Sequence, residues 1–427
     1  FSIIPCTSAT PCLTPPADPG LAGGGDVFIK SGNPFNATIT ARAFGGTTTP
    51  NFGLGTAKGT ETVTLTRTLM APGAGSSGTL TGTGATTPLY RSSFSNGVAS
   101  VSDLAWDEVG VITLTATNST FLGQTLLTAG TSGNVGRFIP DHFDTVVVQS
   151  CAAGGFSYAG QPFTVQVTAK NAGGNKTLNY NAAAGFSKAV TLSAWDGTGL
   201  IANPGPGNLT PTQPPAIIAA SAFTALDPAV ALVSTPTYTF ISRQTAPTTI
   251  RLRAIDTDAV SSATGSEGTT TVRSGRASLS NAHGSELLDL PVPFRVEYWD
   301  GSWQRNTDDT CTTGITLALA DVSVSDGLVP GETCVLDSGN PGISGIGCTA
   351  AGIAPKRFAE PPVAADFRLW LKAPGIGNSG ALNLTATVPT WLQFNWKGIG
   401  DANPSARVTF GVNAARKSPI IYMRENY

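Results

Sequence analysis

The chain has 427 residues, which is more than one hydrophobic core usually serves, so we expect three domains. Only 12% of the residues are charged, the formal net charge is −2, and no run of Lys or Arg occurs, which argues against nucleic acid or an acidic membrane as a partner. Hydrophobic residues make up 41% of the chain, enough to build cores, and this excludes a disordered polypeptide.

The N-terminal segment 1–25 contains two cysteines, several prolines and a glycine run. It does not read as part of the strand pattern that follows, so we interpret it as a linker or as a donor strand for a neighbouring sheet. The first residue is Phe1 rather than an initiator Met. We therefore expect either a removed secretion signal or an excerpt from a longer protein.

Short runs of alternating apolar and polar residues recur along the chain, between clusters of Gly, Pro, Asn and Ser, whereas helical periodicity is scarce. Alternation with β-branched residues is typical of strands that have one face in water. The clearest runs are 63–66, 111–116, 163–169 and 249–254. The sequence thus predicts an all-β protein with few or no helices.

An internal repeat divides the first 274 residues into two similar units. Residues 34–42 (PFNATITAR) match 162–170 (PFTVQVTAK) at an offset of 128. The size of each unit is typical of an immunoglobulin-like β-sandwich, so we assign sandwiches to 26–137 and 138–274. Further matches pair Asn51-Phe52 with Asn179-Tyr180, 63–65 with 190–192, 112–114 with 250–252, and Gly136-Arg137 with Gly275-Arg276, with an insertion near 203–230.

The third region, 275–427, has no partner in the repeat but again shows alternating runs, so we assign it a third sandwich. It holds five of the seven tryptophans, which we expect to fill its core. Its strand candidates are 294–299, 315–319, 367–371, 381–387, 408–412 and 420–425. Its tryptophans are Trp299, Trp303, Trp370, Trp391 and Trp396.

The even number of cysteines, with no C-x-x-C pair, favours disulfides formed in an oxidising compartment. Six cysteines allow fifteen pairings, and the sequence does not choose among them. We favour a Cys6–Cys12 bridge and a bridge from Cys311 to either Cys334 or Cys348. The six are Cys6, Cys12, Cys151, Cys311, Cys334 and Cys348.

The longest apolar tract, 214–233, is interrupted by Asp227-Pro228 and is rich in Ala. We interpret it as a buried helix or a strand pair, so we expect no transmembrane span in this chain.

Residues 275–301 (GRASLSNAHGSELLDLPVPFRVEYWDG) are the most distinctive segment, together with 135–143, 156–163 and 403–411. These segments resemble the surface-protein family named after MshQ, a biogenesis protein of the mannose-sensitive haemagglutinin pilus, which is a type IV pilus. The resemblance implies a protein exported to the bacterial cell surface that works with pili. It implies no catalytic residues.

Candidates for catalysis are few, since the chain has only two histidines, His142 and His283. A Ser-His-Asp set can be drawn with Asp141 or Asp289, but no G-x-S-x-G motif occurs, and a hydrogen-bonded structural role is the favoured interpretation of each His. Two G-x-G-x-x-G matches, at 73–78 and 375–380, are interpreted as turns because neither opens a helix after a strand. We therefore predict that the chain is not an enzyme.

Three carboxylate pairs offer oxygen ligands that would suit a structural calcium ion. None has the dense spacing of a calcium loop, so we interpret them as solvated turn residues and expect no cofactor, with calcium as the lesser option. Glycoside hydrolysis, which also uses two carboxylates, is a minor alternative. The pairs are Asp308 with Asp309, Asp256 with Asp258, and Asp366 with Glu360.

Trp299 and Trp303 flank a turn and could form a platform for a sugar ring. Alternation places Tyr298 and Trp299 on opposite faces of their strand, so we expect at least one of them in the core.

Two classes of function follow from these observations. The first is a noncatalytic extracellular protein of the bacterial surface, either a pilus-associated adhesin or a structural subunit of a filament. Its partners would be pilus or filament subunits, including copies of itself. The second is a secreted carbohydrate-binding protein whose partner is a surface glycan.

Overall fold

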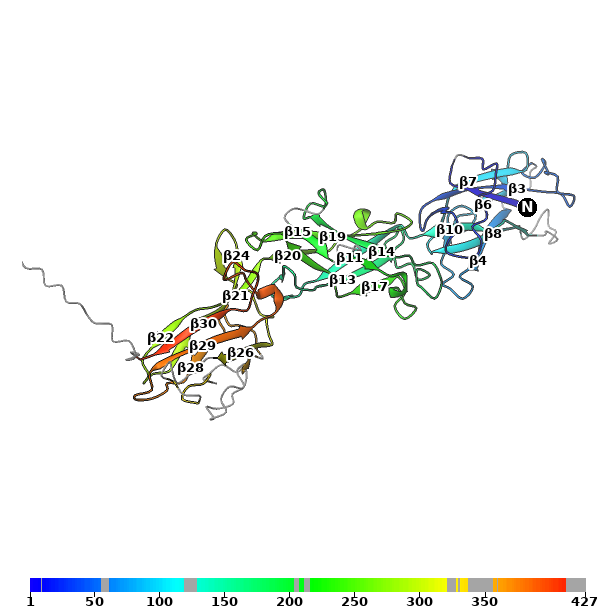
Figure 1. Ribbon diagram of the computed structural model, residues 1–427. Coiled ribbons are helices and arrows are strands. Elements are labelled where there is room, and N and C mark those ends of the chain that lie inside the picture. The colour runs from blue at the N-terminus through cyan, green and yellow to red at the C-terminus, as the bar shows by residue number, and fades with distance from the viewer. Residues whose placement is uncertain are drawn as a thin grey trace, which may run out of the picture.

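A computed structural model describes residues 1–411 except 9, 55–60, 119–128, 203–206, 211–215, 321–327, 329–330, 337–355 and 359. Within these residues the regular elements are β-strands and single 3₁₀ turns, and no α-helix is present. Figure 1 shows the strands gathered in three sandwiches that follow one another in an elongated row. We call them the first (1–139), second (142–273) and third (275–411) sandwich. The prediction of an all-β chain of tandem immunoglobulin-like sandwiches is confirmed.

The first sandwich packs a sheet with strand order β1-β3-β7-β5 against one with order β2-β10-β8-β4-β6, in which β9 adds to β8. Strand β2 pairs in parallel with β10, the last strand of the sandwich, and the other pairs are antiparallel. The elements are β1 (Ser2–Cys6), β2 (Ile29–Lys30), β3 (Phe35–Thr40), β4 (Thr62–Ala71), β5 (Leu80–Thr81), β6 (Leu89–Tyr90), η2 (Arg91–Ser93), β7 (Val98–Trp106), β8 (Gly110–Asn118), β9 (Gly130–Thr131) and β10 (Val135–Ile139).

The second sandwich repeats this plan with sheets β11-β13-β17 and β12-β20-β19-β14-β16 and a small ladder of β15 with β18. Again a short strand, β12, pairs in parallel with the last strand, β20. The elements are β11 (His142–Val148), β12 (Phe156–Tyr158), β13 (Thr164–Lys170), β14 (Val190–Asp196), β15 (Gly207–Thr210), β16 (Ile217–Ile218), η3 (Ala220–Ala222), β17 (Val230–Val233), β18 (Thr237–Phe240), β19 (Thr248–Asp256), η4 (Ser262–Thr264) and β20 (Thr269–Arg273).

The third sandwich has sheets β21-β24-β25 and β22-β30-β29-β26-β27 and a ladder of β23 with β28. The parallel pair at its end is β22 with β30. The elements are β21 (Gly275–Leu279), β22 (Ala282–Gly284), β23 (Leu290–Val292), β24 (Phe294–Trp299), β25 (Trp303–Arg305), β26 (Ile315–Ala320), β27 (Lys356–Phe358), β28 (Leu369–Leu371), β29 (Gly380–Thr387), η6 (Thr390–Leu392) and β30 (Ser405–Phe410). The strand expected at 420–425 lies outside the described residues.

The strands form because their apolar residues alternate and their inward side chains meet those of the facing sheet. In β4, for example, Val63 and Leu65 are buried while Thr64 and Thr66 are exposed. The repeat seen in the sequence corresponds to equivalent strands: 63–65 and 190–192 lie in β4 and β14, and 112–114 and 250–252 lie in β8 and β19.

One match of the repeat is wrong. Gly136-Arg137 lies in β10, the last strand of the first sandwich, whereas Gly275-Arg276 lies in β21, the first strand of the third. A single Gly-Arg pair carries too little pattern to indicate which strand it occupies.

The N-terminal residues also differ from the expectation of a linker or donor strand, because Ser2–Cys6 pairs with β3 over five residues and forms an edge strand of the first sandwich.

The tryptophans of the third sandwich do not fill its core, contrary to expectation. Trp370 and Trp396 are each 37% exposed, and Trp299, Trp303 and Trp391 are half-buried. Tyr298 and Trp299 are both half-buried, so neither is a core residue. Phenylalanines form the aromatic centre instead, since smaller rings fit between two sheets without a polar N–H to satisfy. These are Phe294, Phe358 and Phe367.

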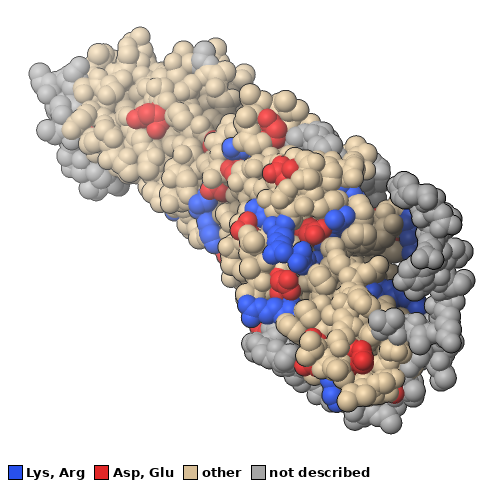
Figure 2. Space-filling model, turned by 90° about the vertical axis from the view of Figure 1, so that its left-hand side faces the viewer, with Lys and Arg blue, Asp and Glu red and all other residues tan. Residues whose placement is uncertain are grey.

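On the face of the molecule drawn in Figure 2, charged residues do not separate into fields of one sign. Figure 2 shows basic and acidic side chains beside one another on the face in view. Among the described residues, no helix has the length and apolar character needed to cross a membrane.

Candidate functional site: the joints between the sandwiches

The residues considered for catalysis do not converge. His142 Nδ1 lies 2.8 Å from Asp141 Oδ2 near the start of the second sandwich, whereas His283 is exposed on β22 of the third. Asp289 accepts a hydrogen bond from the backbone N–H of Ala373 and has no described contact with His283. Among the described residues, several buried polar groups lie instead at two places, where one sandwich meets the next.

Glu108 is the central residue of the first joint, which we define as the contact between the first and second sandwiches. It lies in the tight turn between β7 and β8 and is 3% exposed. Its Oε2 accepts a hydrogen bond from the Leu178 N–H at 2.9 Å, and its Oε1 accepts one from the Asn179 N–H at 3.1 Å. Burial raises the pKa of Glu108, although these N–H donors and that of Val109 act in the opposite direction.

Asn179 crosses the same joint in the reverse direction. Its Oδ1 accepts a hydrogen bond from the Ser76 N–H at 2.7 Å, and its Nδ2 donates to the carbonyls of Ser76 and Val109 at 2.9 and 2.8 Å. The side chain thereby satisfies backbone groups of the first sandwich that would otherwise be buried without partners. Nearby, Asn171 Nδ2 donates to the Asp107 carbonyl at 2.9 Å.

A bidentate ion pair closes another side of the first joint. Arg137, in β10, donates from Nη1 and Nη2 to the two carboxylate oxygens of Asp258 at 2.5 and 2.8 Å, and it is 4% exposed. Planar pairs of this kind are specific in direction as well as strong. Asn33 adds a hydrogen bond of 2.6 Å to Asp141. Burial acts to raise the pKa of Asp141, but hydrogen bonds from His142 and Asn33 outweigh it and lower the pKa.

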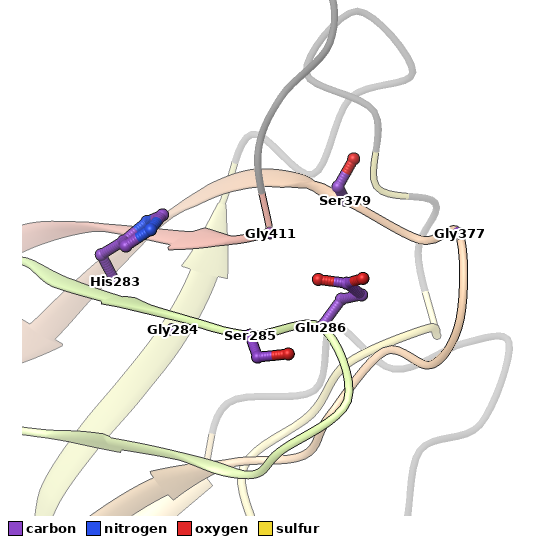
Figure 3. A pocket seen from close by; sticks show the side chains of 7 residues that line it. All are labelled: His283, Gly284, Ser285, Glu286, Gly377, Ser379 and Gly411. Carbon is purple, nitrogen blue, oxygen red and sulfur yellow. The ribbon is translucent and has the colours of Figure 1, made fainter.

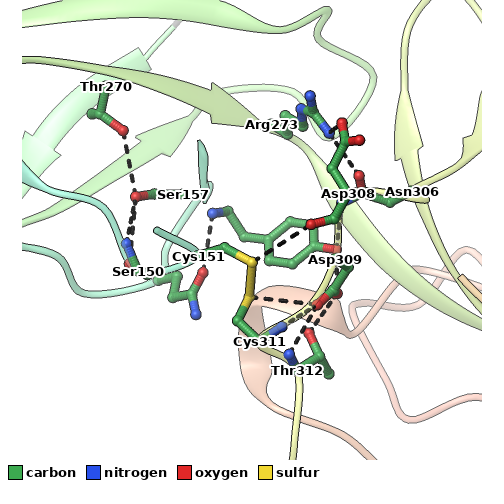
Figure 4. Close-up of a disulfide and its surroundings, with 12 residues drawn as sticks. Ser150, Cys151, Ser157, Thr270, Arg273, Asn306, Asp308, Asp309, Cys311 and Thr312 are labelled. Atoms are coloured by element: carbon green, nitrogen blue, oxygen red, sulfur yellow. Dashed lines mark hydrogen bonds and ion pairs between the residues drawn. A yellow bond between two sulfur atoms is a disulfide. The ribbon is translucent and has the colours of Figure 1, made fainter. Parts of the chain in front are cut away.

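The second joint, between the second and third sandwiches, is covalent. Cys151, in the turn after β11, is bonded to Cys311, in the loop between β25 and β26, across a sequence separation of 160. Figure 4 shows Asp309 and Thr312 beside this disulfide. Cys311 was expected to pair with Cys334 or Cys348, and that expectation is wrong. Cys334 and Cys348 are nearer to Cys311 in the sequence, but the end-to-end packing of the two sandwiches brings Cys151 next to it.

Beside the disulfide, Tyr158 enters a fully hydrogen-bonded pocket of the third sandwich. Its hydroxyl donates to Asp309 Oδ2 at 2.7 Å and accepts from Asn306 Nδ2 at 2.6 Å. Asp309 also accepts from the N–H and the hydroxyl of Thr312. Burial, with the charge of Asp309, raises the pKa of Tyr158 far above its ordinary value, so the hydroxyl keeps its proton.

Two arginines of the second sandwich complete the second joint. Arg273 forms an ion pair with Asp308 at 2.8 Å, and its guanidinium lies 4.5 Å from the ring centre of Phe156 and 4.7 Å from that of Tyr298. Arg243 forms an ion pair with Asp401 and donates to the carbonyl oxygens of Thr390 and Trp391. These contacts hold two sides of the joint at once.

The apolar cores also continue through both joints. Val109, Val111 and Ile139 of the first sandwich belong to the buried cluster of the second. Phe156 and Tyr158 of the second sandwich belong to the cluster of the third. Each joint therefore combines buried apolar contact with hydrogen bonds between buried polar groups, as a domain interior does, rather than being built like a linker.

The carboxylates considered as calcium ligands are engaged with protein donors. Asp256 accepts from the Tyr180 hydroxyl, Asp258 pairs with Arg137, Asp308 pairs with Arg273, and Asp366 pairs with Arg295, while Asp309 is used in the second joint as described. Glu360 is exposed. The other cysteines fall in two groups. Cys6 and Cys12 form the predicted disulfide and Cys334 is also disulfide-bonded, whereas Cys348 lies outside the described residues.

Trp299 and Trp303 meet across the β24–β25 hairpin with ring centres 5.5 Å apart in an edge arrangement. The Arg276 guanidinium lies 4.1 Å from the ring centre of Trp303 and pairs with Glu297. Phe394 lies against another side of Trp303 at 5.0 Å. The arrangement uses these rings for contacts within the sandwich.

Most joint residues were not identified from the sequence. Asn179 appeared in the repeat only as the match of Asn51, and Glu108 and Tyr158 gave no pattern of their own. One usable signal was the pair Asp107-Glu108, because adjacent acids directly before an apolar strand are unusual in a chain with 12% charged residues.

Comparison with solved structures finds other multidomain β proteins at low similarity. The Yersinia pseudotuberculosis adhesin InvE is 16% identical with a TM-score of 0.22, over 57% of this chain and 55% of that one, so the match spans about half of the InvE chain. An I-band fragment of titin is 10% identical with a TM-score of 0.25, over 90% and 95% of the two chains. The C-terminal domain of the Streptococcus pyogenes antigen I/II-family protein AspA is 11% identical with a TM-score of 0.28, over 64% and 99%.

No curated protein matches the sequence. Family models match in succession along nearly the whole chain. The second domain of DUF6701 matches residues 8–102, the third matches 108–278 and the fourth matches 273–426. The chain thus belongs to the DUF6701 family and comprises its second, third and fourth domains.

Proposed function

We propose that this chain is a noncatalytic protein of the bacterial cell surface in which three sandwiches act as one stiff spacer. It would serve a pilus-associated adhesin or form a structural subunit of a surface filament. The observation that carries the proposal is the construction of the joints, where buried polar groups of one sandwich form hydrogen bonds with the next. Glu108 and Tyr158 are the clearest examples.

Stiffness follows from the cost of turning a joint. Rotation at the first joint would separate Glu108 from the N–H groups of residues 178 and 179 and leave its side chain with only the Val109 N–H as a donor, which is unfavourable. Rotation at the second joint is opposed by the Cys151–Cys311 bond and by the Tyr158 hydrogen bonds. Domains of one chain move freely when their interface is small and polar, whereas both joints bury apolar side chains that the two sandwiches share.

The location rests on separate support. Disulfides persist in proteins that leave the cytoplasm. In the described part of this chain, Cys6–Cys12 lies within the first sandwich and Cys151–Cys311 joins the second sandwich to the third. A surface spacer must keep its shape without chaperones, and cross-links favour that. The resemblance of residues 135–143, 156–163 and 275–301 to the MshQ family supports association with a pilus.

Small-angle X-ray scattering of the purified chain tests the proposal. We expect one straight rod to account for the whole profile. The matched variant combines Asn179→Ala with Cys151→Ser and Cys311→Ser, which weakens both joints and should give a profile that needs a mixture of bent shapes. A wild-type profile that itself requires bent shapes would refute the spacer.

Carbohydrate binding is the second candidate and has weaker support. Trp396 is 37% exposed and lies beside Phe394 at 5.1 Å, so part of the aromatic cluster does reach solvent. The ring of Trp303, however, is already in contact with Arg276 and Phe394. A glycan array probed with the wild type and with Trp303→Ala decides between the functions. Binding that the substitution removes would favour the carbohydrate function over the spacer.

A further inference from the structure

The outer faces of the first and third sandwiches, as far as the structure describes them, repeat the surfaces that form the joints. In the first joint, the turn after β2 (31–33) and the turn between β7 and β8 (107–109) of the first sandwich receive the loop after β13 (171–179) of the second. In the second joint, Ala159 and Gly160 after β12 and the segment after β18 lie against the loop between β29 and β30 of the third sandwich. At each joint, the turns at one end of a sandwich therefore form the receiving surface, and the loops at the near end of the next sandwich insert into it.

The inserting loop also exists on the first sandwich, where it is free among the described residues. Residues 42–51 follow β3 as residues 170–179 follow β13, at the offset of 128. The two loops have five hydrogen bonds in common. In the first sandwich these bonds run from Ala43 N to Thr47 O, Gly46 N to Ala43 O, Thr49 N to Ala41 O, Phe52 N to Thr49 O and Arg42 Nη1 to Gly46 O. In the second sandwich the bonds that correspond, in the same order, run from Asn171 N to Asn175 O, Gly174 N to Asn171 O, Thr177 N to Ala169 O, Tyr180 N to Thr177 O and Lys170 Nζ to Gly174 O.

The two loops differ at the tip. Ala172 donates its N–H to the Ser31 carbonyl, and a Cβ placed on Gly32 would lie 3.2 Å from the Ala172 Cβ, so the tip fits tightly in the first joint. Its counterpart on the first sandwich is Phe44, whose side chain is fully exposed. A fully exposed aromatic side chain at the tip of a preformed loop is a strong candidate for an anchor that a partner buries. Such an anchor needs a cavity in the partner.

The receiving end of the third sandwich has such a cavity. Strand β22 pairs in parallel with the last strand β30, as β2 does with β10, so the turn after β22 corresponds to residues 31–33. A cavity of about 490 Å³ lies at this turn, with Glu286 and Ser379 among its lining residues (Figure 3). Beside the cavity, in the same two turns, three large apolar side chains are more than half exposed. These are Leu287, Leu288 and Ile376.

We propose that this end of the third sandwich binds loop 42–51 of a second copy of the chain, with Phe44 seated in the cavity. The exposed leucines and Ile376 supply apolar contact for the ring, and Glu286 supplies charge opposite to that of Arg42. The contact joins unlike ends, so it does not close on itself and adds copies in a row. The inference deepens the proposed structural function, since copies joined in this way would continue the rod.

Sedimentation velocity and electron microscopy of the purified chain test the inference over a concentration range reaching about 0.5 mM, where even weak contacts are populated. We expect end-to-end assemblies that grow with concentration. Phe44→Ala should weaken assembly by about tenfold or more. Leu200→Ala, which removes an exposed side chain of the second sandwich away from both ends, should leave assembly unchanged.

A mixing experiment separates the two ends. Phe44→Ala keeps its receiving end and Ile376→Ser keeps its inserting loop, so neither variant should extend alone, and their mixture should stop at dimers. Monomeric wild type at every concentration, or full assembly of Phe44→Ala, would overturn the inference. If scattering shows a straight monomer that does not associate, the end-to-end contact is refuted and the spacer function is kept. If the monomer is bent but associates, the spacer function is refuted and the end-to-end contact is kept.

Discussion

Across the second joint, the hydroxyl oxygen of Tyr158 lies 2.7 Å from Oδ2 of Asp309, although 151 residues separate them in the chain. The contact sits beside the Cys151–Cys311 disulfide and inside the core of the third sandwich. It joins the domains through a neutral donor and a carboxylate, and Asn306 and Thr312 complete the hydrogen bonding of both. The second joint is thus cross-linked by a disulfide and also held by a buried set of hydrogen bonds around the Tyr158 hydroxyl.

Removing this hydroxyl should weaken the joint. Tyr158→Phe keeps the ring but leaves Asp309 and Asn306 with one buried partner fewer, so we expect a loss of about 1 to 3 kcal/mol in the free energy of unfolding. Urea unfolding followed by tryptophan fluorescence measures it. Tyr298→Phe is the matched control, because its ring over Arg273 is retained. Equal stabilities of the two variants would contradict the assigned role of Tyr158.

The two disulfides should contribute unequally. Cys151→Ser with Cys311→Ser opens a loop of 160 residues, and we expect it to cost about 2 to 5 kcal/mol. Cys6→Ser with Cys12→Ser opens a loop of only 6 residues, which by chain entropy alone contributes about 3 kcal/mol less. Thermal unfolding of both double variants checks this. A larger effect from the short loop would argue that native strain, not chain entropy, dominates.

The repeat provides a matched pair for the first joint. Asn179→Ala removes three hydrogen bonds that cross the joint and should destabilise the chain by about 1 to 3 kcal/mol. Asn51→Ala makes the same change at the equivalent exposed position of the first sandwich, where we expect an effect within about 0.5 kcal/mol. Denaturant unfolding of the dilute chain measures both. Similar losses would mean that Asn179 acts within its own loop and not across the joint.

Glu108 should make stability depend on pH. Burial raises its pKa in the folded chain above the ordinary 4.5, so on raising the pH the unfolded chain loses this proton first. The stability that Glu108 contributes is therefore fully present below its pKa in the unfolded chain and is lost as the pH rises through its pKa in the folded chain. Between about pH 4 and pH 7, Glu108→Gln should lose less stability than the wild type. Asp256, whose pKa burial also raises, titrates in both proteins and cancels in the comparison.

Urea midpoints of the wild type and Glu108→Gln at several pH values measure this difference. Parallel curves would show that Glu108 is ionised in both states, and that the donors of residues 178 and 179 outweigh burial.

Local pattern predicted the strands well, because alternation is a property of adjacent residues. Val63 and Leu65 in β4, and Val190 and Leu192 in β14, were identified as equivalent before their sheets were known. The prediction weakened where composition stood in for pattern. The tryptophans of the third region suggested a core, yet the space between its sheets is filled by Phe294, Phe358 and Phe367.

The joints were beyond such reasoning. Cys151 meets Cys311, and Glu108 meets Asn179, only because whole sandwiches stack end to end. Each residue alone is a common type in an ordinary turn, and nothing nearby in sequence marks its partner.

By itself, the order of amino acids determined that this protein is a series of β-sandwiches with little charge, since strand alternation and repeat length are written in consecutive residues. Tertiary structure alone decided which cysteines bond and which carboxylates are buried. Those outcomes depend on contacts between residues far apart in the chain, and such contacts exist only after each sandwich has formed and presents a surface of fixed shape to the next.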